Sequence, residues 1–375
     1  MKTSRVLTLI LAGGEGNRLG PLTRDRAKPV VPFLGSFRLL DFVLSNVAHS
    51  HLREVWVLEQ FQSHSINEHL QGGRPWDLDR THGGLHILPP MQGHPESDWH
   101  QGNADALWRS SRVIRQHDPD LVLVLSADAV YRLDYRDVIA AHENSGAEVT
   151  MVVKRIPRAE ATRFGNALCD DAGRVTRFAY KPDEPLGDES GALVTCEVFV
   201  YTARVLLEVL DELVRRTGDA PEEAALSDFG HELLPELVAR GKAQAFPIES
   251  YWRDVGTLES YFESHQEFLH APPFDVNDPA WPIWTHYGPQ SGARLEAGAS
   301  VENSLVCAGA HVAGTVVGSV IGPGAVVEAG AHVEECIING GAVVKGNVSL
   351  RRVIVDEGGV AEEDCEGGEE VKVLD

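Results

Sequence analysis

The sequence predicts an α/β protein with two parts: an open, mostly parallel sheet with helices on both faces, then a parallel β-helix. Two observations carry this prediction. Apolar strand-like runs alternate with helix-like segments from residue 1 to about 250, which is typical of doubly wound sheets. Beyond about residue 290, apolar positions recur at six-residue steps among glycines, which is typical of hexapeptide β-helix repeats.

Hydrophobic periodicity sets the expected elements of the first part. Continuous apolar runs predict strands at 6–12, 55–58, 121–125, 148–154 and 193–201. The run at 121–125 lacks polar alternation, as expected of a strand buried on both faces of a parallel sheet. Apolar residues at helical spacing predict helices at 39–47, 104–117, 206–213 and 232–238.

The first expected strand has a second interpretation. Lys2 and Arg5 followed by the apolar run at 6–12 imitate a minimal signal peptide. No A-x-A-like site follows, and the glycine-rich segment 13–16 does, so we expect a buried strand. No stretch reaches the roughly 18 consecutive apolar residues of a membrane span.

The second part is predicted by a step of six. Apolar positions pair as 306 with 312, 338 with 344 and 354 with 360, with shorter, irregular steps between such pairs. Each hexad would form one side of a β-helix, and glycine permits its corners. A generic glycine-rich all-β segment is the alternative. Prolines between 272 and 289 mark a linker, so we expect domains at 1–270 and 293–375 joined by 271–292.

The charge balance excludes several kinds of partner. The chain has 375 residues, with 33 Lys and Arg against 56 Asp and Glu, a net charge of −23. Such a chain is poorly suited to a nucleic acid polymer or an anionic membrane surface. The acidity is uneven, because 15–38 has five basic and two acidic residues whereas 356–375 has one basic and nine acidic. A basic pocket for an anionic substrate therefore remains possible.

Cysteine usage points to a reducing compartment. The five cysteines form no C-x-x-C pair and their number is odd, which argues against a disulfide framework and against a cysteine zinc site. We therefore expect a cytoplasmic protein.

The most informative segment joins a strand end to a glycine run: Leu11-Ala12-Gly13-Gly14-Glu15-Gly16-Asn17-Arg18-Leu19, followed by Ala27-Lys28-Pro29. Such glycines let backbone N–H groups turn toward an anion and form a phosphate-binding nest. Arg18 and Lys28 would add positive charge. The segment fits neither the complete dinucleotide fingerprint nor the P-loop pattern. The alternative is a glycine turn beside a solvated arginine.

This segment resembles the sugar-1-phosphate nucleotidylyltransferases, and within them the branch that makes ADP-glucose. Five further segments in the family's order support the resemblance: Phe37-Arg38-Leu39-Leu40-Asp41-Phe42 with Leu44-Ser45-Asn46, Gln60-Phe61-Gln62-Ser63-His64, Gly102-Asn103-Ala104-Asp105-Ala106, Tyr251-Trp252-Arg253-Asp254-Val255-Gly256-Thr257 and Trp281-Pro282-Ile283. The resemblance implies a Rossmann-like nucleotidyltransferase domain and a left-handed hexapeptide β-helix.

The resemblance also implies a reaction in α-glucan precursor synthesis. ATP and a sugar 1-phosphate, by default glucose 1-phosphate, would give a nucleotide sugar and pyrophosphate. Such chemistry depends mainly on positioning and charge neutralisation. Arg18 would stabilise the leaving pyrophosphate and Lys28 the reacting phosphate. The loop residues Leu11, Ala12, Gly13, Gly14 and Gly16 would hold the triphosphate.

Two carboxylates are candidates for metal binding. Asp128 follows the strand at 121–125, at the carboxyl edge where open α/β sheets bind ligands, and Asp254 follows Tyr251-Trp252-Arg253. By resemblance both would bind Mg²⁺, which takes one or two carboxylates together with substrate phosphates, and Asp128 would be catalytic. The alternative for each is an Asp that caps a turn or helix.

The remaining candidates would hold the base and the sugar phosphate. For the base, the resemblance points to Gln60, Gly102 and Asp105. Gln60 can pair with the edge of the nucleobase through its amide, or it is a polar loop residue. Asp105 is either a base-binding residue or an acidic residue in the first turn of a helix, where the helix dipole favours negative charge. Lys181 offers the sugar phosphate a cation, or is an exposed turn lysine. The full set of sugar-phosphate candidates is Gly165, Lys181, Thr195, Glu197 and Asp228.

Departures from the family pattern concern the sugar and regulation. The family has Glu-Lys-Pro where this chain has Tyr180-Lys181-Pro182, and Ser-Met-Gly where it has Thr195-Cys196-Glu197. Glu197 would either replace the missing sugar contact or block the pocket. Asp25 stands where bacterial members often have a lysine linked to activation by sugar phosphates, and it would repel an anionic activator.

Three functions fit these residues. The first is an active enzyme on ATP and glucose 1-phosphate, which the retained basic and acidic residues favour. The second is the same chemistry on another sugar, such as glucosamine 1-phosphate, whose amine Glu197 or Asp228 could pair. The third is a non-catalytic regulatory paralogue. The family's members are commonly tetramers, and the exposed end of a β-helix also favours oligomers.

Overall fold

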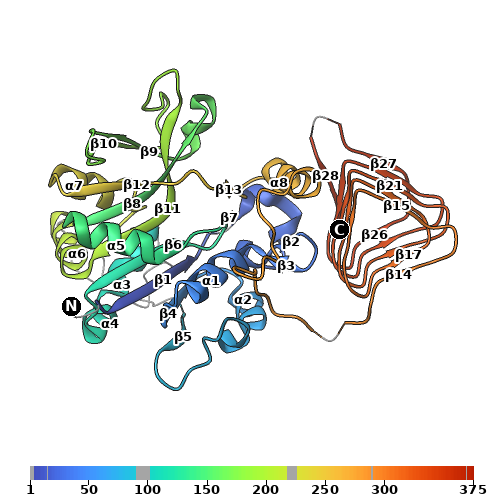
Figure 1. Cartoon of the computed structure of the whole chain (residues 1–375), viewed down its shortest axis with the longest axis horizontal. Helices are drawn as coiled ribbons and strands as arrows, with labels where there is room; N and C mark the ends of the chain where they lie inside the picture. The colour runs from blue at the N-terminus through green and yellow to red at the C-terminus, as the bar shows by residue number, and fades with distance from the viewer. Residues whose placement is uncertain (1–3, 15, 90–101, 218–225, 289, 369) are drawn as a thin grey trace.

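The computed structural model describes residues 4–14, 16–89, 102–217, 226–288, 290–368 and 370–375. An α/β part and a stack of short parallel strands lie side by side, with helix α8 (Leu258–His270) at their junction (Figure 1). Glu15, which belongs to the basic segment of the sequence, lies outside the described residues. None of the helices described here is long and apolar enough to cross a membrane.

A nine-stranded mixed sheet forms the centre of the α/β part. β5, β4, β1 and β6 lie side by side and run parallel, and β11 then pairs antiparallel with β6, β8 and β9. The apolar run at 6–12 is therefore a central strand, as expected. The strands of this sheet are β1 (Val6–Ala12), β4 (Glu54–Glu59), β5 (Gly84–Leu88), β6 (Leu121–Ser126), β8 (Val149–Ile156), β9 (Gly165–Cys169), β10 (Val175–Tyr180), β11 (Ala192–Thr202) and β12 (Ala243–Pro247).

Helices cover both faces of this sheet, as the alternating pattern predicts. Apolar residues of α3, α4, α6 and α7 pack on one face, and those of α1, α2 and α5 pack on the other. These helices are α1 (Leu39–His49), α2 (Ser63–Leu70), α3 (Asn103–Arg109), α4 (Ser111–His117), α5 (Tyr135–Ser145), α6 (Ala203–Thr217) and α7 (Leu233–Ala239). The single helix expected at 104–117 is thus two helices, which meet at Ser110, since adjacent serines are weak helix formers.

Short elements connect these layers near the end of β1. They are the 3₁₀ helices η1 (Asn17–Thr23), η2 (Lys28–Val30), η3 (Gln71–Trp76) and η4 (Arg158–Arg163), and the strands β2 (Pro32–Phe33), β3 (Phe37–Arg38), β7 (Ala129–Tyr131) and β13 (Trp252–Asp254). β2 pairs with β3 and β7 pairs with β13, both antiparallel.

The second part is a stack of parallel strands in three five-stranded sheets, as expected of hexapeptide repeats. Its buried core includes Ile321, Val327, Val333, Ile338 and Val344, so the inward positions step by six, six, five and six. The shorter, irregular steps of the sequence are therefore mostly fives, with a step of four from Val312 to Val316. The strands are β14 (Arg294–Leu295), β15 (Ser300–Glu302), β16 (Leu305–Val306), β17 (His311–Val312), β18 (Thr315–Val317), β19 (Val320–Ile321), β20 (Val326–Val327), β21 (His332–Glu334), β22 (Ile337–Ile338), β23 (Val343–Val344), β24 (Ser349–Arg351), β25 (Val353–Val355), β26 (Val360–Ala361), β27 (Cys365–Glu366) and β28 (Lys372–Leu374).

One side of the β-helix packs directly on the α/β part. Its contact row is Val320, Ile337, Ile354 and Val371, from successive coils. This row shares one apolar cluster with residues of the segment 19–37 and of α8. Because Lys28 belongs to that segment, the β-helix supports a piece of chain that carries a candidate site residue.

Candidate active site

A buried lysine joins the two candidate metal carboxylates. Lys28 is 6% exposed, and its Nζ donates a 2.6 Å hydrogen bond to Asp128 Oδ2 and lies 3.7 Å from Asp254 Oδ1. Burial alone would lower the pKa of Lys28, but the charges of Asp128 and Asp254 outweigh it and raise the pKa. The same ammonium outweighs burial at Asp128 and lowers its pKa. Lys28 and Asp128 are therefore held as an ion pair.

Strand pairing and glycine positions bring these residues together. Asp128 lies in the turn between β6 and β7, and the β7–β13 register places Asp254 opposite Ala129. Gly16 has a φ of 70°, and a Cβ there would lie 3.0 Å from the Lys28 Cβ. A side chain at Gly16 would therefore strain the backbone and push on Lys28, so this glycine sets how closely the phosphate loop approaches the lysine.

Arg18 lies at the same cluster from the solvent side. Its side chain is exposed, and a Cβ at Gly256 would lie 3.3 Å from Arg18 Nη2 and 2.7 Å from Asp254 Oδ2. The bare backbone of Gly256 thus lets the guanidinium and the carboxylate approach. Arg18 is free to turn toward an anion because it projects into solvent.

The two side chains expected to bind the nucleobase, Gln60 and Asp105, lie in different surroundings. Gln60 follows β4 directly and lies beside the phosphate loop, since a Cβ at Gly13 would lie 3.4 Å from Gln60 Oε1. Asp105 is instead fully buried and accepts a 2.8 Å hydrogen bond from Arg109 Nε one helical turn on. This placement favours the alternative that Asp105 serves its own helix.

Gly102 and Gly165 each allow another segment with a candidate residue to approach closely. A Cβ at Gly102 would lie 2.4 Å from the Ser227 carbonyl, directly before Asp228. Gly165 lies against Thr195 in the same way, because a Cβ there would lie 2.9 Å from Thr195 Oγ1. These glycines pack segments together, so their role in this structure is to set spacing.

Tyr180, which stands where the family has a glutamate, pairs with Asp228. Its Oη donates a 2.6 Å hydrogen bond to Asp228 Oδ2, and burial together with Asp228 raises its pKa, so the phenol stays protonated. Lys181 is exposed, and its Nζ lies 4.5 Å from the centre of the Tyr180 ring, a cation–π contact. Tyr180 thus orients two expected sugar-site groups.

Glu197 is the most unusual residue of the site. It lies in a register irregularity of β11 between Thr195 and Phe199 and has a φ of 54°, a left-handed conformation that glycine adopts without strain. Burial, and then the charges of Asp128, Asp254 and Asp228, raise its pKa to about 8. Strain and a buried acid at one position are typical of functional sites.

Eleven residues line one small pocket: Arg18, Ser126, Asp128, Ala129, Arg163, Phe164, Lys181, Cys196, Glu197, Trp252 and Asp254. The pocket therefore contains all the charged candidates except Lys28, Asp105 and Asp228. Lys28 contacts the two lining carboxylates Asp128 and Asp254, and Asp228 is bound to Tyr180. The sequence does not predict Arg163 as a site residue, although it lies two positions before the candidate Gly165. Nor does it predict Ser126, which donates to Asp128 Oδ1.

The two carboxylates fit a divalent metal ion that is completed by substrate. Asp128 and Asp254 share one ammonium. The two carboxylates therefore carry more negative charge than Lys28 offsets, and a divalent cation between them would neutralise it. Among the residues described here, no group of three or more His, Cys, Asp or Glu is arranged to hold a metal. The protein would therefore supply two ligands, and phosphate oxygens and water the rest. The nucleotidylyltransferases that the sequence resembles generally use a divalent metal.

The chemistry open to this arrangement is transfer at a phosphorus. Arg18, Lys28 and Lys181 place positive charge around the two carboxylates, and a glycine-rich loop ends at the same point. Such a set can neutralise the oxygens of a reacting phosphate and of a leaving phosphate group.

Comparison with known proteins supports this chemistry. Residues 7–271 match the family model for nucleotidyl transferases, and residues 292–373 match the model for the GlmU-like C-terminal hexapeptide. The chain is 41% identical over 332 residues to a glucose-1-phosphate adenylyltransferase of Thermotoga neapolitana, a match that covers 86% of this chain and 76% of the relative. It is 38% identical over 322 residues to the enzyme so named in Halalkalibacterium halodurans, which covers 85% and 81%. The one in Fervidobacterium nodosum is 35% identical over 364 residues, covering 97% and 85%.

Proposed function

The chain belongs to the nucleotidyl transferase family, and from this premise we propose that it transfers the adenylyl group of ATP to glucose 1-phosphate. A phosphate oxygen of the sugar would form a bond to the α-phosphorus, the bond to the β-phosphate would break, and pyrophosphate would leave. The observation that carries the proposal is the buried contact of Lys28 with Asp128 and Asp254 at the end of the glycine loop.

Each group of the cluster then has a role. Lys28 holds the α-phosphate oxygens and balances their charge as the oxygen attacks, and Arg18 stabilises the leaving pyrophosphate. The backbone of 11–14 and 16 surrounds the triphosphate, and Gln60 beside Gly13 pairs with the base. Lys181, with Thr195 and Gly165 behind it, receives the sugar phosphate.

We propose Mg²⁺ as the metal, bound by Asp128 and Asp254. It would withdraw charge from the phosphate oxygens. The side chains around it stay fixed, since Ser126 donates to Asp128 and Val255 N donates to the Asp128 carbonyl at 3.4 Å.

We also propose that the protein is an oligomer of the cytoplasm. The first coil of the β-helix leaves Leu295 57% and Leu305 39% exposed, and its strands β14 to β16 pair on one side only. Its five cysteines are unpaired, which fits a reducing compartment. Light scattering of the purified protein measures the oligomeric state, and we expect a tetramer.

Pyrophosphate release tests the activity. The purified chain with ATP, glucose 1-phosphate and Mg²⁺ should release pyrophosphate, EDTA should abolish the release, and excess Mg²⁺ should restore it. A panel with glucosamine 1-phosphate and with UTP or GTP defines the preferred pair. No release with any pair would contradict the proposal, and co-purification with an active relative would then identify a regulatory paralogue.

A further inference from the structure

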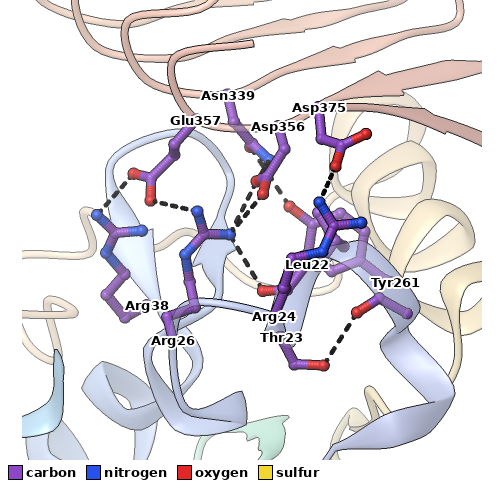
Figure 2. Close-up of polar contacts among 11 residues, drawn as sticks. Leu22, Thr23, Arg24, Arg26, Arg38, Tyr261, Asn339, Asp356, Glu357 and Asp375 are labelled. Atoms are coloured by element: carbon purple, nitrogen blue, oxygen red, sulfur yellow. Dashed lines mark hydrogen bonds and ion pairs between the residues drawn. The ribbon is translucent and has the colours of Figure 1, made fainter. Parts of the chain in front are cut away.

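Two carboxylates of the β-helix hold the segment that carries Lys28. Arg26 Nη1 donates hydrogen bonds of 2.8 and 3.0 Å to the two carboxylate oxygens of Asp356, and its Nη2 lies 3.3 Å from Glu357 Oε2 (Figure 2). Arg26 is two residues from Lys28, a reach of about 7 Å of extended chain. A shift of the guanidinium therefore moves the backbone that aims the lysine.

A second arginine closes the same contact. Arg38 Nη2 donates a 2.8 Å hydrogen bond to Glu357 Oε1, so Glu357 contacts both arginines (Figure 2). Arg26 precedes η2, and Arg38 is the last residue of β3. The acidic pair thus fixes the Lys28 segment at both of its ends.

A chain of hydrogen bonds also links the segment that follows Asp254 to Asp356. Helix α8 begins at Leu258, four residues after Asp254. Tyr261 Oη of that helix donates to Asn339 Oδ1 at 3.4 Å, and Asn339 Nδ2 donates to Asp356 Oδ1 at 3.5 Å. Both segments that meet at the active site are therefore tied to Asp356.

Stability alone does not account for these charges. Asp356 is 9% exposed and Arg26 is 15% exposed at their side chains, and the apolar row of the β-helix already packs beside them. Burying an ion pair costs desolvation that a hydrophobic pair of the same size would avoid. What the ion pairs add is direction, since Nη1 of the planar guanidinium faces Asp356 while Nη2 faces Glu357, and the two contacts together fix its orientation.

We propose that Asp356 and Glu357 are positioning residues for catalysis, which hold Lys28 and Asp254 in register through Arg26, Arg38 and Tyr261. They touch no reacting atom. This proposal rests on the proposed adenylyl transfer, because it assigns Lys28 to the reacting phosphate. Both segments contact the same corner of the β-helix. One acidic pair is therefore enough to hold both Lys28 and Asp254 in place.

The first test is a split between kcat and KM. We expect the double variant Asp356→Asn with Glu357→Gln to lower kcat by about 10- to 100-fold, the scale of a 1 Å misplacement, with KM values within about 3-fold. Lys345→Ala is the matched control, because it removes a 3.2 Å ion pair to Glu328 between two coils of the β-helix, and it should leave kcat unchanged. A double variant with wild-type kcat, or a control with an equal loss, would overturn the proposal.

The second test is rescue by a small anion. Arg26, Arg38 and Glu357 line a cleft of about 610 Å³ between the two parts of the molecule, so formate can reach the arginines once the carboxylates are shortened. In Asp356→Ala with Glu357→Ala, formate should restore kcat severalfold, whereas chloride at equal ionic strength should not. A loss of activity that formate leaves unchanged would indicate a merely structural role and overturn the proposal.

A third test does not depend on activity. Lys28 is protected by burial, so reductive methylation followed by mass spectrometry should label it severalfold faster in the double variant than in wild type or in Lys345→Ala. Equal labelling would overturn the positioning role. A wild-type protein that releases no pyrophosphate, yet shows this difference in labelling, would contradict the proposed function and leave the contact between the β-helix and the Lys28 segment supported.

Discussion

Lys28 Nζ lies 2.6 Å from Asp128 Oδ2 and 3.7 Å from Asp254 Oδ1, so one buried ammonium contacts two carboxylates that are 126 positions apart in the sequence. One ammonium against two carboxylates leaves an excess of negative charge, and burial raises the pKa of Asp254. A divalent metal that arrives with the triphosphate would offset this charge, and the two carboxylates are already in place to bind it.

Replacement of Lys28 by Met should remove most of the activity. The side chain keeps its length but loses the charge that faces the reacting phosphate, and we expect kcat to fall by about 100-fold or more. Pyrophosphate release at saturating ATP and glucose 1-phosphate measures the effect. Lys242→Met is the control, because Lys242 is 61% exposed and forms a 3.2 Å ion pair with Glu148. A Lys28 variant with more than a tenth of wild-type kcat would contradict the assignment.

Replacement of Glu197 by Gly should change the choice of sugar. The variant removes a carboxylate from the pocket that contains Lys181. It also removes backbone strain, because glycine adopts the φ of 54° at this position freely. We expect the ratio of kcat/KM for glucosamine 1-phosphate to that for glucose 1-phosphate to fall by about 10-fold, the value of roughly one charged contact. Steady-state kinetics on both sugars measures it.

A control separates the charge of Glu197 from its backbone strain. Glu335 in the β-helix has a φ of 49°, so Glu335→Gly relieves a similar strain far from the pocket and should leave the ratio unchanged. If Glu197→Gly also leaves it unchanged, the carboxylate does not contact the sugar. If activity on glucose 1-phosphate rises severalfold, Glu197 blocks the pocket instead.

Local patterns were sufficient for the fold, but not for the contacts between its parts. The apolar run at 6–12 predicts the central strand β1 because its seven residues fit a buried strand, and the six-residue step predicts the β-helix because inward positions repeat. Neither pattern contains the five-residue step at Val333 to Ile338 or the row from Val320 to Val371, since those depend on how coils stack and on which side meets α8.

The site shows the same division. The motif around Gly13 and Asp128 are brought together because β1 and β6 are parallel neighbours that end at one edge of the sheet. Asp254 joins them through the antiparallel pair of β7 and β13. The pair of Asp105 with Arg109 has the four-residue spacing of a helical ion pair, so the helix expected at 104–117 contained a signal for it. The hydrogen bond from Tyr180 to Asp228 joins residues 48 positions apart, and no spacing in the sequence specifies it.

Replacement of Tyr180 by Phe should weaken the binding of the sugar phosphate but not the binding of ATP. The variant removes the 2.6 Å hydrogen bond to Asp228, and a bond to a charged acceptor contributes about 1.5–3 kcal/mol. Asp228 then moves, so KM for glucose 1-phosphate should rise about 10-fold while KM for ATP stays constant. Tyr287→Phe is the control, because Tyr287 is 55% exposed. Equal changes in both KM values would show that Tyr180 supports the fold rather than the sugar site.

Acid should destabilise the protein through His265. This residue of α8 is fully buried; Leu34 N donates to its Nε2 at 3.0 Å, so Nε2 has no proton and Nδ1 donates to the Tyr261 carbonyl at 2.7 Å. Burial lowers its pKa from 6.5 to about 4. The folded state therefore binds fewer protons than the unfolded state between these values, and the stability present above pH 6.5 is lost as pH falls toward 4.

His265→Gln measures this loss, because glutamine can still accept from Leu34 N but does not titrate. By urea unfolding, the wild-type advantage over His265→Gln should shrink by about 2 kcal/mol between pH 7.5 and pH 5, given 1.36 kcal/mol per pKa unit. His142, whose pKa burial also lowers to about 4, titrates in both proteins and cancels in the difference. A constant difference across this range would mean that His265 titrates alike in the folded and unfolded states. The contact between α8 and Leu34, which lies in the segment that carries Lys28, would then not limit stability in acid.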